Sequence, residues 1–126
     1  MSNLAVAITG FVVGDDLEVR RTITGLTSAM TSAWITVKRY EGQADLDAKL
    51  QKQITTVDVP GTGQIEVAGG VGVDGDLRFD LSQANTTALG LATWVYDIQV
   101  KLADGKVYTV EKGTITLTGD VTTATS

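Results

Sequence analysis

The feature that most constrains this chain is an alternation of apolar and polar residues with a period of two, repeated between glycine-rich breaks. It is most regular over residues 94–122, WVYDIQVKLADGKVYTVEKGTITLTGDVT, on both sides of Asp104-Gly105. Residues 76–82 repeat it, with Leu77, Phe79 and Leu81 on one face and Asp76, Arg78 and Asp80 on the other. A period of two with one polar face is typical of antiparallel sheets that have one solvated side.

Two more segments follow this period, each with one exception. Residues 17–24 place their aliphatic side chains on one face together with Arg21, and residues 33–39 place theirs opposite Trp34. The 14 glycines and the single proline separate segments rich in Val, Ile and Thr, which is the composition of short strands joined by turns. About seven such strands and no long helix predict two packed antiparallel sheets.

One or two short helical turns are expected between the strands. Leu46, Leu50 and Ile54 fit a helical spacing, although residues 46, 48 and 50 also fit a strand. We expect a helical turn near Asp45, followed by a strand through residues 52–59 that Pro60-Gly61 ends. Residues 82–90, SQANTTALG, are expected to form a polar crossover with one helical turn capped by Ser82.

The alternation around Asp104-Gly105 predicts a β-hairpin. A two-residue loop would pair Leu102 with Val107, whereas a three-residue loop, residues 103–105, pairs Val100 with Tyr108 and Ile98 with Val110. The second register buries more apolar surface, and Gly105 suits the left-handed position of such a loop. After Lys112 the apolar residues move from even to odd positions, which predicts a β-bulge at Gly113 with Val110 and Ile115 both inward.

Tyr96 follows a crossover loop at the start of the next-to-last strand, the place of the tyrosine corner in immunoglobulin-like sandwiches. We therefore expect an immunoglobulin-like β-sandwich without its usual disulfide, in which the Tyr96 hydroxyl bonds backbone of the crossover. The 126 residues suffice for one domain. We divide them into a sandwich over 14–122, a strand or arm over 1–13, and a short tail over 123–126.

Composition excludes several functions. The net charge is −5 without a basic stripe, so we expect no binding to nucleic acid. Cysteine and histidine are absent, which removes disulfides, thiolate or imidazole metal ligands, and the commonest nucleophile and base. The apolar run over residues 4–13 lacks a basic leader and a cleavage site, and it is shorter than the ~20 residues of a membrane helix. We therefore expect that the protein is made in a cytoplasm and does not associate with a membrane.

The motifs that carry chemistry elsewhere are interpreted here as turns. Residues 70–75, GVGVDG, match G-x-G-x-x-G, but a dinucleotide site needs a helix after the motif, and a strand follows. Asp74, Asp76 and Asp80 do not have the spacing of a calcium loop. Asp15 and Asp16 are neighbours that point to opposite faces of a strand and open the first core strand. No catalytic triad can be assembled, so the sequence predicts no enzyme and no catalytic, cofactor-binding or metal-binding residues.

Four segments in order, residues 14–39, 45–55, 74–89 and 96–122, resemble a family of small tailed-bacteriophage and prophage virion proteins. The last is the most specific, with a tyrosine, a D-G turn, Lys-Val-Tyr-Thr, a glycine and a final Asp-Val-Thr. The family is similar to the N-terminal immunoglobulin-like domain of baseplate upper proteins. This chain departs from it in the longer apolar start and in having no receptor-binding or trimerising region after the sandwich.

The resemblance implies a structural virion protein: a capsid decoration, cement or head-surface subunit, or alternatively a tail or baseplate adaptor. Its partners would be the major capsid protein or tail and baseplate proteins; a homo-oligomer is left open. The chain would be made in the host bacterial cytoplasm and reside in the virion. An alternative of another class is a carbohydrate- or ligand-binding module that uses Trp34 or Trp94 on a sheet face. The alternation of Leu4, Val6 and Ile8 with smaller residues allows residues 1–13 to be an ordinary first strand or an arm to a neighbouring subunit.

Overall fold

The computed structural model describes residues 4–12, 16–39, 49–89 and 93–118, and the predicted helical turn near Asp45 lies outside them. The described residues form eight strands and one helix: β1 (Leu4–Val12), β2 (Leu17–Ile23), β3 (Met30–Lys38), β4 (Leu50–Ile54), β5 (Gly63–Val67), β6 (Gly75–Leu81), α1 (Gln83–Leu89), β7 (Thr93–Leu102) and β8 (Val107–Thr118).

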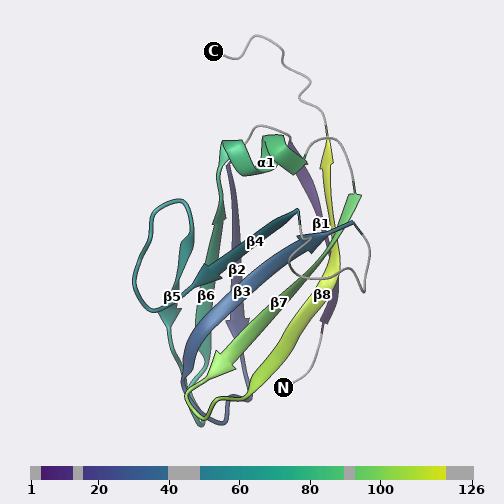
Figure 1. Ribbon diagram of the computed structural model, residues 1–126. Coiled ribbons are helices and arrows are strands. Elements are labelled where there is room, and N and C mark those ends of the chain that lie inside the picture. The colour runs from purple at the N-terminus through teal and green to yellow at the C-terminus, as the bar shows by residue number, and fades with distance from the viewer. Residues whose placement is uncertain (1–3, 13–15, 40–48, 90–92, 119–126) are drawn as a thin grey trace.

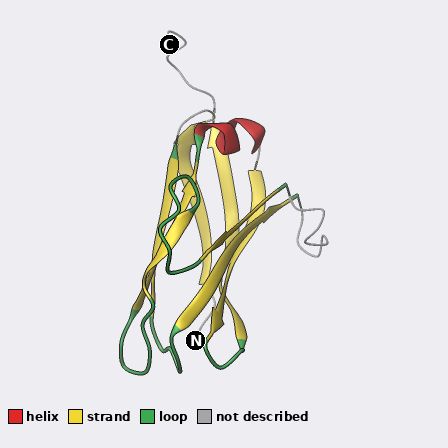
Figure 2. Ribbon diagram, turned by 60° about the vertical axis from the view of Figure 1, so that its left-hand side comes forward, coloured by secondary structure: helices red, strands yellow, loops and turns green. Residues whose placement is uncertain are grey.

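The strands lie in two sheets that pack face to face, with α1 across one end (Figure 1, Figure 2). One sheet has the order β1-β8-β7-β3-β4, and the other has the order β2-β6-β5. Neighbouring strands are antiparallel, except that β1 runs parallel to β8. This order matches the immunoglobulin division, with β2, β6 and β5 in the places of strands B, E and D, and β3, β7, β8 and β4 in those of C, F, G and C′. The predicted immunoglobulin-like sandwich is confirmed, with eight described strands where about seven were expected.

The core lies between the sheets and includes the inward residues that the alternation predicts for β6 and β7. β6 buries Leu77, Phe79 and Leu81. β7 buries every second residue: Trp94, Tyr96, Ile98, Val100 and Leu102. Each large apolar side chain of this kind stabilises the fold by about 1.5–3 kcal/mol relative to an exposed position. The two facing sheets are therefore held mainly by apolar burial.

The β7–β8 hairpin has the predicted three-residue loop. Val100 is paired with Tyr108, and the Leu102 amide donates to the Lys106 carbonyl at 2.9 Å. Gly105 has a φ of 89°, a left-handed conformation that glycine adopts without strain. The Lys106 amide donates to Asp104 Oδ1 at 2.9 Å, which closes the turn.

The bulge in β8 exists, but its predicted position at Gly113 is wrong. The register shifts between Ile98 and Gln99, which are paired with Glu111 and Thr109, so that Val110 is the extra residue. Ile98 is therefore not paired with Val110. Val110 and Ile115 are both buried, as expected. The position differs because Glu111 does not face water: it is buried and begins the inward series of odd-numbered residues.

The predicted tyrosine corner is also wrong. The Tyr96 hydroxyl donates to the carboxylate of Glu111 in β8 rather than to crossover backbone. The crossover is held instead by Trp94, whose Nε1 donates to the Leu89 carbonyl at 3.2 Å. A charged acceptor beside Tyr96 forms a stronger hydrogen bond than a carbonyl, which explains why its hydroxyl turns to Glu111.

Helix α1 begins as the sequence predicts, with Ser82 as its cap. The backbone amide of Asn85 donates to Ser82 Oγ at 3.4 Å, and the backbone amide of Ser82 donates to Asn85 Oδ1 at 2.9 Å. This is a reciprocal capping box in which asparagine takes the usual place of glutamate. The Gln83 amide donates to Asp16 Oδ1 at 2.9 Å, so Asp16 both precedes β2 and caps α1.

The strand expected over residues 52–59 ends earlier, at Ile54. The chain then crosses to the other sheet, where the backbone amide of Ile65 in β5 donates to the Thr55 carbonyl at 2.7 Å. Val57 and Val59 are exposed and give residues 55–59 no apolar face to bury. Pro60 and Gly61 lie in the following turn, as the sequence predicts.

Of the two alternatives for the N-terminal segment, an ordinary first strand or an arm to a neighbouring subunit, β1 shows the first. It pairs with β8 of its own chain from Leu4 opposite Glu111 to Val12 opposite Thr118, with a register shift between Ile8 and Phe11. Residues 4–12 thus form the first strand of the sandwich. The contribution of residues 1–13 to a neighbouring subunit stays a prediction.

Candidate interaction surface

The outer face of the five-stranded sheet presents polar side chains in rows across the strands. In one row Trp34 of β3 lies between Gln53 of β4 and Gln99 of β7, and Gln99 is paired with Thr109 of β8. The Gln99 amide group donates to Thr109 Oγ1 at 3.3 Å. Cross-strand contacts of this kind fix the orientation of the side chains on the face.

The adjacent row joins Gln51, Thr36, Asp97 and Lys112 across β4, β3, β7 and β8. Gln51 Nε2 donates to Thr36 Oγ1 at 3.0 Å. Thr36 is only 3% exposed although it lies on the outer face. Thr36, Asp97 and Lys112 of this row line a surface depression.

That depression has a volume of about 690 Å³ and lies over β3, β7 and β8. Thr36, Asp97, Gln99, Thr109 and Lys112 are among the residues that line it. Its walls thus combine hydroxyl, amide, carboxylate and ammonium groups. Val95, Tyr96 and Gly113 also line it, so its surface combines apolar with polar groups, as protein interfaces commonly do.

The two tryptophans differ in accessibility. Trp34 is half-buried on the outer face, beside the depression. Trp94 is buried in the core, and the Arg39 guanidinium lies 5.7 Å from the centroid of its ring. Of the pair that the sequence singles out, Trp34 is therefore the one able to offer its ring to a ligand.

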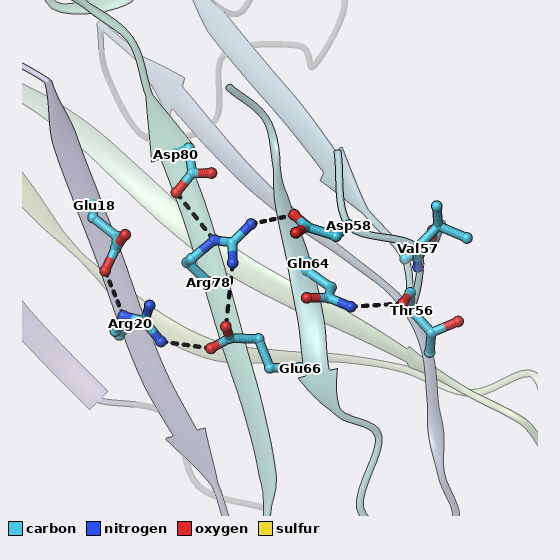
Figure 3. A network of polar contacts seen from close by, with 10 residues as sticks. Glu18, Arg20, Thr56, Val57, Asp58, Gln64, Glu66, Arg78 and Asp80 are labelled. Carbon is cyan, nitrogen blue, oxygen red and sulfur yellow. Dashed lines mark hydrogen bonds and ion pairs between the residues drawn. The ribbon is translucent and has the colours of Figure 1, made fainter. Parts of the chain in front are cut away.

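The outer face of the three-stranded sheet carries a network of ion pairs (Figure 3). Arg78 of β6 contacts Asp58, Glu66 at 3.2 Å and Asp80 at 3.2 Å. Glu66 also binds Arg20 of β2 at 2.6 Å, so it joins the two arginines of neighbouring strands. The hydrogen bond to Asp58 raises the pKa of Arg78 above its ordinary value. These ion pairs link β2, β6, β5 and the loop before β5.

A second polar cluster lies inside the sandwich. Arg21 of β2 donates through Nε to Glu111 Oε1 at 2.6 Å and through Nη2 to Oε2 at 3.1 Å, and the Tyr96 hydroxyl donates to the same carboxylate. Hydrogen bonding to Glu111 raises the pKa of Arg21, and burial raises the pKa of Tyr96 well above its ordinary value. Glu111 thus accepts hydrogen bonds from Arg21 of the facing sheet and from Tyr96 of the neighbouring strand.

Sequence reasoning noted Arg21 as an exception on an apolar face but did not connect it with Glu111. The available signal was that both residues interrupt the alternation of their strands with opposite charges. Two such exceptions on strands of facing sheets indicate a buried pair.

The residues of the sequence motifs are separated by the fold. The glycine-rich residues 70–75 connect β5 to β6, with Gly70 and Val73 bridged, so a strand follows the motif as expected. Asp76 accepts a hydrogen bond from Thr22 at 2.9 Å, Asp80 pairs with Arg78, and Asp74 is exposed. Asp15 lies outside the described residues.

Within the described ranges, no group of three or more acidic side chains is arranged to hold a metal ion. The part of the chain that the structure describes also contains no helix with the length and hydropathy of a bilayer-spanning segment.

Comparison with known proteins finds no matching family model and no matching curated protein. A search of solved structures finds similarity to the collagen-binding subdomain of the Enterococcus faecalis surface protein ACE. The two share 15% identity with a TM-score of 0.26, over 87% of this chain and 92% of that one. At that TM-score the similarity adds nothing to the fold assignment, which rests on the strand order described above.

Proposed function

We propose that this chain is a non-enzymatic structural protein of a tailed-bacteriophage virion, with the capsid surface as its place and decoration or cementing as its role. The observation that carries the proposal is where the virion-like segments fall in the fold. Residues 14–39 hold β2 and β3, residues 45–55 hold β4, residues 74–89 hold β6 and α1, and residues 96–122 hold most of β7 and all of β8. The segments that carry the resemblance thus contain most of the core strands and are not confined to one loop.

The surface of the described residues supports a role in protein association. The arginines of the three-stranded sheet are tied to neighbouring carboxylates, which leaves them little freedom for acid–base chemistry. The depression on the five-stranded sheet is open to solvent and is lined by apolar as well as polar groups. A tail or baseplate adaptor uses the same features, and the location within the particle decides between the two.

The test is the distribution of the protein in a lysate of the phage that carries its gene. Particles are separated on a density gradient, and quantitative mass spectrometry compares this chain with the major capsid protein in each fraction. The proposal predicts that the chain sediments with particles at a fixed ratio that survives a second gradient. Recovery only in the soluble fraction contradicts it. Empty heads without tails, run on the same gradient, retain a head subunit and lose a tail or baseplate adaptor.

A second candidate function, carbohydrate or ligand binding, is favoured by one observation: Trp34 stands half-exposed between Gln53 and Gln99, beside the depression. An aromatic ring flanked by amide groups can stack on a sugar ring and bond its hydroxyls. The test is a glycan array probed with the native chain and with Trp34→Ala. Binding that is lost in Trp34→Ala but kept in the matched variant Gln64→Ala, on the other sheet, supports this function; no binding by the native chain contradicts it.

A further inference from the structure

The described residues give the sandwich four edge strands, and these differ in how they are protected from pairing with another chain. β1 and β4 end the larger sheet, and β2 and β5 end the smaller one. Edge strands expose unpaired backbone groups, and proteins commonly protect them with inward-pointing charges, bulges, short length or a covering segment.

β2 and β4 each carry an inward-pointing cation. Arg21 of β2 lies on the core face and reaches Glu111. Lys52 of β4 is paired with the fully buried Ile35 and therefore shares its inward face, where its ammonium donates to the Gly61 carbonyl. Pairing a foreign strand against either edge would enclose a charge further, which disfavours such pairing.

β5 is protected in another way. It has five residues and a register shift between Ile65 and Val67. Its Ile65 amide is already bonded to the Thr55 carbonyl, and the Gln64 side chain donates to the Thr56 carbonyl at 3.0 Å. Residues 55 and 56 therefore cover this edge.

Over its first half, β1 has none of these protections from the part of the chain that the structure describes. Its nine residues, LAVAITGFV, contain no charged residue and no proline. The pairing with β8 is regular from Leu4 to Ile8, and the register shift comes only after Ile8. Among the described residues, no strand pairs with the other side of β1. A regular, uncharged edge strand is the kind that accepts a further strand.

We propose that this edge binds a second copy of the chain, with the two β1 strands antiparallel about a two-fold axis. The sequence of β1 is its own complement in this arrangement. When Val6 lies opposite Val6 of the second copy, Leu4 lies opposite Ile8 and Ala5 opposite Ala7, so large residues meet large ones and small residues meet small ones. The chain carries a net charge of −5, and pairing through its uncharged strand brings no like charges into register. The two five-stranded sheets become one continuous sheet.

The test uses charge exchange at Ala5 and Ala7. The double variants Ala5→Glu/Ala7→Glu and Ala5→Lys/Ala7→Lys each place like charges opposite one another in the paired strands. Sedimentation equilibrium at chain concentrations up to about 100 μM, well above a micromolar dissociation constant, measures the mass. The native chain is expected at twice its 13.2 kDa, each variant at the single mass, and an equimolar mixture of the two variants again at twice the mass. The matched control, Gln51→Glu/Gln53→Glu, adds the same charge to β4 and keeps the dimer.

Restored association in the mixture shows that both variants are folded, so loss of fold is separated from loss of pairing. A second variant, Val6→Cys, checks the register: the chain has no other cysteine, and oxidation is expected to link two copies through position 6. A native chain that stays monomeric overturns the proposal and leaves this edge to a strand of a different protein. Charged variants that dimerise like the native chain, or a mixture that stays monomeric, overturn it as well.

Discussion

Arg21 and Glu111 form an ion pair that joins the two sheets of the sandwich from positions 90 residues apart in the sequence. The Glu111 side chain is 3% exposed and the Arg21 side chain 28% exposed. The carboxylate therefore depends on its protein partners, whereas the guanidinium keeps contact with water. The bulge at Val110 brings Glu111 to the inward face of β8, so the bulge and the ion pair belong to one local arrangement.

Removing Arg21 is expected to destabilise the fold more than removing Glu111. Arg21→Ala leaves a buried carboxylate without its cation and is expected to cost about 3–5 kcal/mol. Glu111→Gln leaves an arginine that can turn to water, and we expect a cost of about 1–2 kcal/mol. Urea unfolding of both variants measures the free energies. The double variant Arg21→Met/Glu111→Leu is the control, since replacing a whole buried pair by apolar residues is often neutral. A smaller loss in Arg21→Ala than in Glu111→Gln contradicts this account.

The hydroxyl of Tyr96 is expected to make stability fall at high pH. Its folded-state pKa is raised, chiefly by burial, so the native state holds the phenolic proton more tightly than the unfolded state. This stabilisation is complete below the unfolded pKa of about 10 and is lost as the pH rises through the folded pKa.

Tyr96→Phe removes this pH-dependent stabilisation. It also removes the hydrogen bond to the charged Glu111 carboxylate, and such a bond is worth about 1.5–3 kcal/mol. Unfolding free energies measured from about pH 8 to about pH 11 should show a gap between native chain and variant that narrows above about pH 10. Tyr108→Phe, which keeps Tyr96, should retain the pH dependence of the native chain. A difference in unfolding free energy that stays constant over this range would exclude a contribution of Tyr96 to the pH dependence of stability.

The alternation of side chains predicted the sandwich, the inward residues of β6 and β7, and the hairpin loop, because these follow from a period of two and from the preference of Gly105 for a left-handed turn. The position of the bulge, the hydrogen-bond partner of Tyr96 and the partner of Arg21 could not be predicted for one shared reason. Each depends on Glu111 facing inward, and a glutamate is assigned to solvent unless its partner is known. The outer face around Trp34 depends on which strands are neighbours, and that order is set by long-range packing.

Gly63 is expected to be among the least replaceable glycines. It has a φ of 127°, and a Cβ atom added there would lie 2.0 Å from the Arg78 carbonyl oxygen. Gly61 has a φ of 81° with nothing within 4 Å of such an atom. Gly61→Ala is therefore expected to cost about 1–2 kcal/mol from backbone strain alone, and Gly63→Ala more than that because backbone must also move. Thermal unfolding of both variants measures the difference; equal losses would show that the close contact with Arg78 does not matter.

The cap of α1 is expected to behave as one unit. Ser82→Ala and Asn85→Ala each remove one of the two reciprocal hydrogen bonds, and each should cost about 1 kcal/mol. Because either change also releases the other side chain, the double variant should lose less than the sum of the two. A double-mutant cycle by urea unfolding measures the coupling. Strict additivity would mean that the two side chains cap the helix independently, for example because Asp16 alone holds the first turn.

Whether this sandwich is a structural subunit of a virion, as we propose, can be determined from an image of the particle. Cryo-electron microscopy of purified particles, with the chain identified by fitting its two sheets of five and three strands, gives both presence and location. The account predicts a symmetric set of these sandwiches on the outer surface of the capsid. Particles that lack density of this shape, in a preparation where the soluble fraction contains the protein, would contradict it.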